Sequence, residues 1–194
     1  MQFPVSKDQG DFVSGTVVSL NSDGVLSKQS GTTVYKNQHI FERMMVDSQA
    51  ISLASDIFVV VYHGHVAAIK LGAHDQVIEE KLFELPTGQI GKQRDVDCAI
   101  RVPNTNVILV LGNMEVIPVH IEYNNPGFYY EYGDPTLYYF SPLDLRPSIT
   151  VDGNRFAILF TDNDYFTRLM TGTIDVESLT VTMTTDNIVI EEQT

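Results

Sequence analysis

The chain contains a single cysteine, Cys98, among its 194 residues. One cysteine cannot form an internal disulfide, so no covalent cross-link of this kind stabilises the fold. Cys98 stands one residue before the apolar start of a repeat that is described below. We therefore expect it to be a buried structural thiol.

The chain also lacks any apolar stretch of the length that a membrane span needs. The segment Met1–Asp8 has neither a basic opening nor an apolar run, so no secretory signal is expected. We therefore expect no membrane insertion. If the protein leaves its cell, it does so by a route that needs no such signal.

Basic residues are scarce. Twelve lysines and arginines stand against 25 aspartates and glutamates, which gives a net charge of −13. A field of this sign repels the phosphates of nucleic acids and the headgroups of anionic lipids. Nucleic acid and membrane surfaces are therefore not expected as partners.

The sequence motifs of common catalytic sites are missing as well. The chain has no Gly-x-Ser-x-Gly, no His-Glu-x-x-His, no glycine-rich phosphate loop and no paired-cysteine metal site. The sequence therefore predicts a protein that is not an enzyme, with no catalytic residues and no cofactor. The alternative is a polysaccharide-cleaving enzyme, which would need Glu131, Asp134 and Asp144 to converge in one groove.

Two short segments have residue types that bind cations. His63 and His65 lie two residues apart at the end of an apolar run, so both could point to one side of a strand. Asp162-Asn163-Asp164 resembles the start of a calcium loop but lacks the downstream glycine and glutamate. A solvated polar turn is the favoured interpretation of both segments, and no metal site is predicted.

The chain does contain an internal repeat. The pattern of the stretch Ala50–Gly64 returns near Ile100 and again near Ile149, at a spacing of 49 residues and without a gap. Each copy reads as an apolar strand, a short polar turn and a second apolar strand. The matching positions are Ile51, Ile100 and Ile149; Leu53, Val102 and Val151; Phe58, Val107 and Phe156; Val60, Leu109 and Ile158; and Tyr62, Leu111 and Phe160.

The second strand of each copy is an unbroken apolar run, as in Phe58–Tyr62 and Val107–Leu111. A strand with one face in water would alternate polar and apolar residues, so this strand is expected to be covered on both faces. If the copies fold into equivalent small sheets, Phe58, Val107 and Phe156 should have equivalent surroundings.

Four strand candidates in about 49 residues are typical of a propeller blade. The sequence therefore predicts a nearly all-β protein with an N-terminal arm over residues 1–11 and one small β-propeller-like domain over residues 12–194. About four units are expected, at 12–49, 50–98, 99–147 and 148–194. Three clear units are too few to close, so either the first 49 residues form a divergent blade or neighbouring chains complete the set.

Two local signals predict details of these strands. The turn Asn21–Gly24 ends in an Asp-Gly pair between two short β-rich runs, which predicts a hairpin. Pro118 interrupts the strand expected over residues 116–122, and a proline belongs at a sheet edge or at a bulge.

Aromatic residues gather between the second and third copies. Seven of the 19 aromatic residues lie from Phe128 to Phe140, after the turn-type segment Asn124-Asn125-Pro126-Gly127 and around Gly133 and Pro135. Such tyrosines suit a protein interface or stacking on sugar rings, and they could equally pack in the core between two blades. The predicted binding surface consists of Phe128, Tyr129, Tyr130, Tyr132, Tyr138 and Tyr139.

The leader Gly15–Lys28, followed by repeats of the Ala50–Tyr62 kind, resembles the tail-fibre, spike and head-decoration proteins of tailed bacteriophages. That resemblance implies a non-enzymatic virion component, assembled in the host cytoplasm and acting in assembly or host attachment. Its implied partners are other virion proteins or further copies of the chain, and a host glycan is a further candidate.

A second resemblance is to four-bladed hemopexin-like domains. The segment Asp97–Pro103, with Asn104 and Gly112, is similar to their blade opening. This resemblance implies a binding scaffold. A carbohydrate-binding module that uses Tyr129, Tyr130, Tyr132, Tyr138 and Tyr139 as its platform is the other alternative to the virion interpretation.

Overall fold

The computed structural model describes residues 18–20, 26–28, 48–62, 64–73, 76–86, 96–138, 147–162, 164, 166–184 and 188–192. These residues form β-strands and connecting turns and contain no α-helix, so the prediction of a nearly all-β protein is confirmed. Within them no helix is long and apolar enough to cross a membrane. The chain divides into two compact units, Met1–Ile40 and Phe41–Thr194.

The described part of the first unit is a β-hairpin. Strand β1 (Val18–Leu20) pairs antiparallel with β2 (Leu26–Lys28), and Leu20 lies opposite Leu26. The hairpin predicted around Asn21–Gly24 is therefore confirmed. The predicted arm over residues 1–11 lies outside the described residues.

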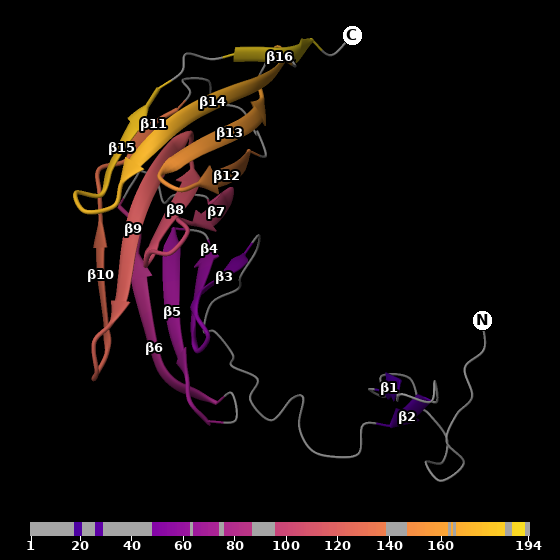
Figure 1. The fold of residues 1–194 in the computed structure, drawn as a ribbon, viewed down its shortest axis with the longest axis vertical. Helices are drawn as coiled ribbons and strands as arrows, with labels where there is room; N and C mark the ends of the chain where they lie inside the picture. Colours follow the sequence, from indigo (N-terminus) through magenta and orange to yellow (C-terminus); the bar gives the residue numbers. More distant parts are fainter. Residues whose placement is uncertain are drawn as a thin grey trace. The chain divides into compact units, whose positions relative to one another are not determined.

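The second unit consists of three antiparallel sheets, which follow one another in the order of the sequence (Figure 1). The first sheet contains β3 (Gln49–Ala54), β4 (Ile57–Tyr62), β5 (His65–Leu71) and β6 (Val77–Glu84). The second contains β7 (Cys98–Arg101), β8 (Val107–Gly112), β9 (Glu115–Tyr123), β10 (Phe128–Tyr132) and the short β11 (Thr136–Leu137). The third contains β12 (Ser148–Asp152), β13 (Arg155–Thr161), β14 (Phe166–Asp175), β15 (Thr180–Met183) and β16 (Ile188–Glu192).

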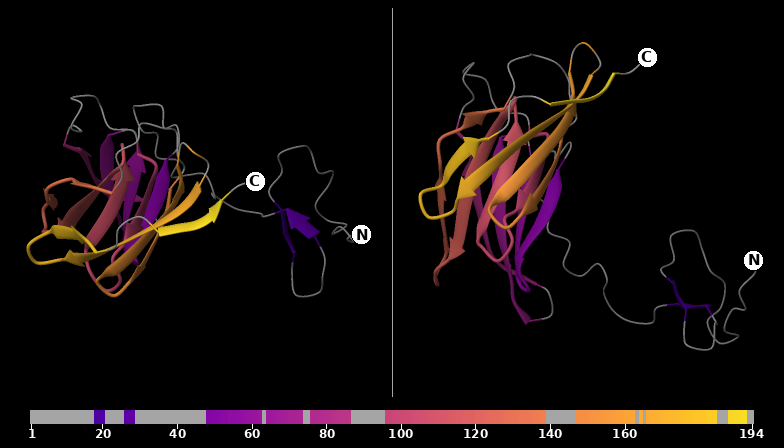
Figure 2. Two further views of the ribbon diagram at one scale, coloured as in Figure 1. Left: turned by 90° about the horizontal axis from the view of Figure 1, so that it is seen from above. Right: turned by 45° about the horizontal axis from the view of Figure 1, so that its top comes forward.

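The second sheet is packed between the other two (Figures 1 and 2). One core joins it to the first sheet and includes Val59, Val61, Val66, Ile108, Val110 and Ile117. The other core joins it to the third sheet and includes Leu109, Leu111, Val116, Phe156, Ile158 and Ile174. All six residues of β8 are buried, so the prediction of a strand covered on both faces is confirmed for this copy. It is wrong for β13, where Leu159 is exposed.

The first strands of the three sheets lie next to one another, β3 beside β7 and β7 beside β12. The side-chain oxygen of Gln49 accepts a hydrogen bond from the backbone N–H of Ala99 at 2.7 Å. The Arg101 guanidinium donates to the carbonyl of Ser52 at 3.4 Å. These two hydrogen bonds hold β3 of the first sheet against β7 of the second.

Phe58, Val107 and Phe156 do not have equivalent surroundings. Phe58 lies on the face of the first sheet that points away from the second sheet, because its neighbour Val59 points into the core between them. Val107 points forward from the second sheet to the third, whereas Phe156 points back from the third sheet to the second. The gapless match at 49 residues is therefore wrong for the second strands.

Between the second and third sheets the turns are equally long, and Val151, like Phe156, packs back against the second sheet, so the whole first hairpin is reversed there. Between the first and second sheets the difference comes from the turn between the first two strands. Three residues separate Leu53 from Ile57, but four separate Val102 from Val107. The β3–β4 ladder also shifts its register between Ser52 and Ala54, which the β7–β8 ladder does not. A shift of one residue moves every following side chain to the other face of its sheet.

With this shift included, the second strands repeat at 50 residues. Strand β4 begins at Ile57 and β8 begins at Val107. Val59 and Leu109 are then equivalent, and each points toward the following sheet. The three sheets therefore stack in the order of the sequence, and their register differs from that of the gapless match.

The two outer faces of the stack differ in chemistry. The outer face of the third sheet carries threonines at 150 on β12, at 171 and 173 on β14 and at 180 and 182 on β15. Near β16 an apolar row crosses that face, where Leu159 pairs with Leu169 and Leu169 pairs with Ile188. On the outer face of the first sheet, Ile78 and Leu82 of β6 are exposed.

Cys98 is half-buried against the core between the second and third sheets. Burial and the charge of Asp97 raise the pKa of the thiol to about 12, against a smaller opposing effect of a hydrogen bond with the backbone of Ile149. The nucleophilic thiolate is therefore almost absent at neutral pH.

We expect Cys98 to react with iodoacetamide at pH 8 on the order of a thousandfold more slowly than a free thiol. Mass spectrometry of timed samples measures the rate, and the same protein in 8 M urea is the control, because unfolding should restore the ordinary rate. Equal rates with and without urea would contradict the assignment of Cys98 as a structural thiol.

Candidate binding site at the edge of the second and third sheets

The predicted aromatic surface separates into core residues and exposed residues. The ring of Tyr130 packs against Phe83 of the first sheet at 4.1 Å between centroids. Phe128 packs edge-on against Tyr123 at 5.2 Å. Both side chains are partly buried against the core between the first and second sheets, so most of their surface is used for packing.

Tyr138 does not belong to the surface. It is buried in the core between the second and third sheets, where its ring packs edge-on against Phe160 at 5.6 Å. Burial raises its pKa, with smaller effects of Asp97 and Cys98, so the hydroxyl stays protonated. Tyr139 lies outside the described residues.

Tyr129 and Tyr132 are the two exposed members of the set, with 53% and 42% of their surface accessible. Both lie on β10, which pairs with β9 in the second sheet. The Tyr132 ring lies 6.0 Å from that of Tyr130, at an interplanar angle of 33°. The binding-surface prediction therefore stays open for these two residues, Tyr129 near the start of β10 and Tyr132 at its end.

Pro118 determines where β10 ends. It lies in β9 at the point where the outer partner of that strand changes from β10, which pairs up to Val119, to β11, which begins opposite Val116. Proline has no N–H to donate to a ladder, so this gap leaves no donor of β9 unpaired. Pro118 is thus at an interruption of the outer ladder and not on an edge strand.

The loop Gly133–Pro135 leaves the sheet at this gap and meets the turn between β14 and β15. Gly133 donates its N–H to the carbonyl of Pro118 at 3.0 Å. A Cβ on Gly133 would lie 1.8 Å from the carbonyl oxygen of Leu179, so only glycine fits between the two segments. Thr136 also contacts the carbonyl of Val181 through its hydroxyl, at 3.5 Å.

The opposing turn is fixed by Asp175. One of its carboxylate oxygens accepts hydrogen bonds from the N–H groups of Glu177 and Ser178, at 3.0 and 3.4 Å. Hydrogen bonds from the Ser178 hydroxyl and from these N–H groups lower the pKa of Asp175. Leu179 then adopts a left-handed conformation, with φ at 51°, and buries its side chain in the core.

Two hollows lie beside this junction. The smaller has a volume of about 280 Å³ and lies between the loop after β10 and the start of β15. The larger, of about 540 Å³, lies on the other side of the turn and reaches the threonines of β14 and β15. Ser178 and Thr180 line both hollows, so the two adjoin.

We expect Gly133→Ala to lower the free energy of unfolding by about 2 kcal/mol, because the added methyl group overlaps the Leu179 carbonyl and one backbone has to move. Urea unfolding followed by circular dichroism measures this loss. Asp134→Ala, one residue further with an exposed side chain, should change stability by less than about 0.5 kcal/mol. Equal stabilities of the two variants would contradict the close contact.

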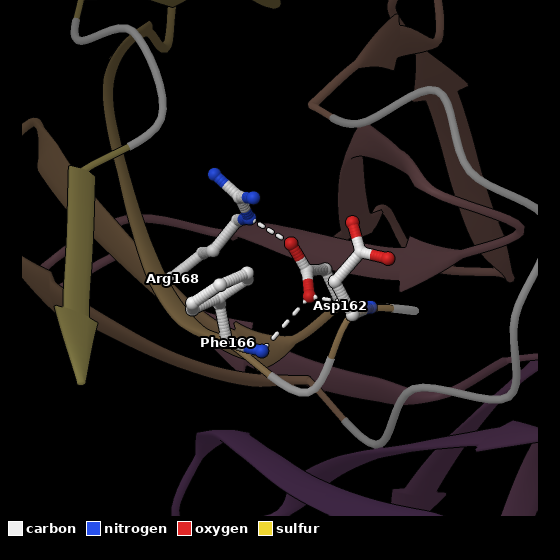
Figure 3. A network of polar contacts seen from close by, with 4 residues as sticks. Asp162, Phe166 and Arg168 are labelled. Atoms are coloured by element: carbon white, nitrogen blue, oxygen red, sulfur yellow. Dashed lines mark hydrogen bonds and ion pairs between the residues drawn. The ribbon is translucent and has the colours of Figure 1, made fainter. Parts of the chain in front are cut away.

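Asp162 is the first residue of the candidate calcium segment. Its carboxylate is hydrogen-bonded to neighbouring groups of the protein (Figure 3). One carboxylate oxygen accepts hydrogen bonds from the N–H groups of Asp164 and Phe166, both at 2.9 Å, and the other pairs with the Arg168 guanidinium. The side chain has no accessible surface. Burial alone would raise its pKa, but the hydrogen bond from Phe166 and the hydrogen bond and charge of Arg168 outweigh burial and lower it.

The other residues singled out by the sequence are described only in part. His65 is buried and stacks on Tyr62 at 5.7 Å, and His63 lies outside the described residues. Glu131 lies opposite His120 within the sheet, Asp134 lines the smaller hollow, and Asp144 lies outside the described residues. Among the described residues no three His, Cys, Asp or Glu side chains form a group that could hold a metal ion.

Comparisons with protein-family models, with curated proteins and with solved structures found no match for this chain. The two hollows beside the loop Gly133–Pro135 and the turn before β15 are therefore interpreted from their own geometry. Sequence reasoning identified Tyr132 and Asp134 but missed Ser178 and Thr180. Their signal was present in the short polar turn Asp175–Ser178 between two strand candidates, but a turn alone does not indicate what it faces.

Proposed function

We propose that the chain is a non-enzymatic virion component of a tailed bacteriophage, which acts in assembly or host attachment. Its three sheets would be an open, propeller-like set of blades that other virion proteins or further copies complete. The resemblance of the leader Gly15–Lys28 and of the repeats to phage fibre and decoration proteins supports this proposal.

The observation that carries the proposal is the chemistry of the two outer faces. Exposed apolar side chains remain on both, with Ile78 and Leu82 on the first sheet and Leu159 and Ile188 on the third. Leu159, Leu169 and Ile188 form a row across three paired strands. Contiguous exposed apolar groups are typical of a surface that another chain covers.

The proposal is tested in particles and in the genome. Mass spectrometry of purified phage particles should detect the chain in stoichiometric amounts, and the neighbouring reading frames should encode other virion proteins. Sedimentation of the purified protein gives its mass in solution. A stable monomer whose gene stands among metabolic genes, and which is missing from particles, would contradict the proposal.

A further inference from the structure

The strongest unassigned feature is the pair of adjoining hollows around Ser178 and Thr180. Their walls come from the loop between β10 and β11 and from the β14–β15 hairpin, which are fixed in place by the fit of Gly133 against Leu179 and by the Asp175 cap. A cavity whose walls are already held needs little ordering when a ligand enters. The hollows are therefore suited to binding.

The lining of the smaller hollow is polar and without positive charge. Asp134 supplies a carboxylate, and Thr136, Ser178 and Thr180 supply hydroxyl groups. Tyr132, whose side chain is exposed, also lines this hollow at the end of β10. Carboxylates accept hydrogen bonds, hydroxyls both donate and accept, and a tyrosine adds an apolar ring face.

The larger hollow continues the same chemistry. Asn154, Thr173 and Thr182 line it together with the carboxylates of Asp175 and Glu177. No lysine, arginine or histidine lines either hollow among the described residues. Anionic ligands such as phosphates, sulfated sugars and sialic acids would therefore meet repulsion without a compensating cation.

We propose that the two hollows form one binding site for a neutral saccharide. The hydroxyl groups of such a ligand would donate to Asp134 and to the hydroxyl oxygens of Ser178 and Thr180, which already donate to Thr180 and to the Ser178 carbonyl within the turn. A saccharide ring matches a wall that carries many hydroxyls and few apolar side chains. This site does not depend on whether the protein belongs to a virion, and it differs from a platform of core tyrosines because Tyr130 and Tyr138 are used in packing.

The first experiment applies the purified full-length protein to an array of neutral and acidic glycans. Saturation-transfer NMR with the methyl glycosides of the sugars that bind then gives their dissociation constants. The expected result is binding of neutral glycans with millimolar dissociation constants, as a shallow hollow with few hydrogen bonds allows. Binding to acidic glycans alone, or to no glycan, would overturn the proposal.

Matched variants locate the site. Thr180→Val removes one hydroxyl from both hollows and keeps the shape and the β-propensity of the side chain, so it should weaken binding about fivefold. Thr150→Val is the control, because Thr150 is also exposed on the outer face of the third sheet but lines neither hollow. Equal loss in both variants, or loss in the control alone, would overturn the assignment to these hollows.

A second pair of variants tests whether the ligand binds at the hollows or elsewhere on β10. Asp134→Asn keeps the size of the side chain and removes its charge, and it should also weaken binding. Tyr129→Ala alters an exposed tyrosine of the same strand that lines neither hollow, so binding should be unchanged. Binding that is lost in Tyr129→Ala and retained in Asp134→Asn would place the ligand elsewhere and overturn the proposal.

Discussion

Leu109→Ala should lower the free energy of unfolding by about 3 kcal/mol. Leu109 has no accessible surface and points from the second sheet into the core that joins it to the third. Truncation removes buried methyl groups and leaves a cavity that the packed strands on both sides cannot fill. Urea unfolding at 25 °C, followed by circular dichroism and by tyrosine fluorescence, measures the change.

Leu159→Ala is the matched control for Leu109→Ala. Leu159 is the equivalent residue of the third sheet at the spacing of 50 residues, but 40% of its surface is exposed because no further sheet of the described chain covers it. Its loss should cost less than about 1 kcal/mol in the monomer. Similar losses in the two variants would contradict the third sheet's position at the end of the stack.

Asp162→Asn should also lower the free energy of unfolding by about 3 kcal/mol at pH 7. The variant keeps the size of the side chain but removes the negative charge that pairs with Arg168 inside the protein. The amide oxygen can still accept from the N–H groups of Asp164 and Phe166, but the NH2 group then faces the guanidinium of the mostly buried Arg168, donor against donor, and the attraction between opposite charges is lost. Chemical unfolding measures the loss, and Asp152→Asn, at an exposed position of β12, is the control.

The effect of Asp162 has a defined pH dependence. Its pKa is lowered in the folded protein, so the stabilisation is complete above the ordinary aspartate pKa of about 4 and is lost as the pH falls through the lowered value. The difference between the parent chain and Asp162→Asn should therefore be constant from pH 7 to pH 5 and should shrink below pH 4. A difference that grows in acid would contradict the assignment.

Strand content was predictable from the sequence because apolar runs and polar turns are local signals. The run Val107–Leu111 predicted a strand covered on both faces, and β8 is buried throughout. The Asp-Gly pair before Val25 predicted a hairpin, which β1 and β2 form. Both predictions depend on properties of neighbouring residues alone.

Register was less predictable because both faces of these strands are apolar. When every position is hydrophobic, the pattern does not show which residues point forward, so a shift of one residue has no signature within the strand. The signal was in the turns, where three residues follow Leu53 and four follow Val102. A comparison of turn lengths would have given the spacing of 50 residues between the first and second sheets, but not between the second and third, where four residues also separate Val151 from Phe156.

The sequence by itself determined that the chain forms repeated small antiparallel sheets, because apolar runs of strand length and polar turns recur at nearly constant spacing. The tertiary structure decided which aromatic side chains are buried and brought Asp134 beside Ser178 and Thr180. These residues are more than 40 positions apart along the chain. Their meeting depends on how two sheets stack, which is a long-range property that no local pattern encodes.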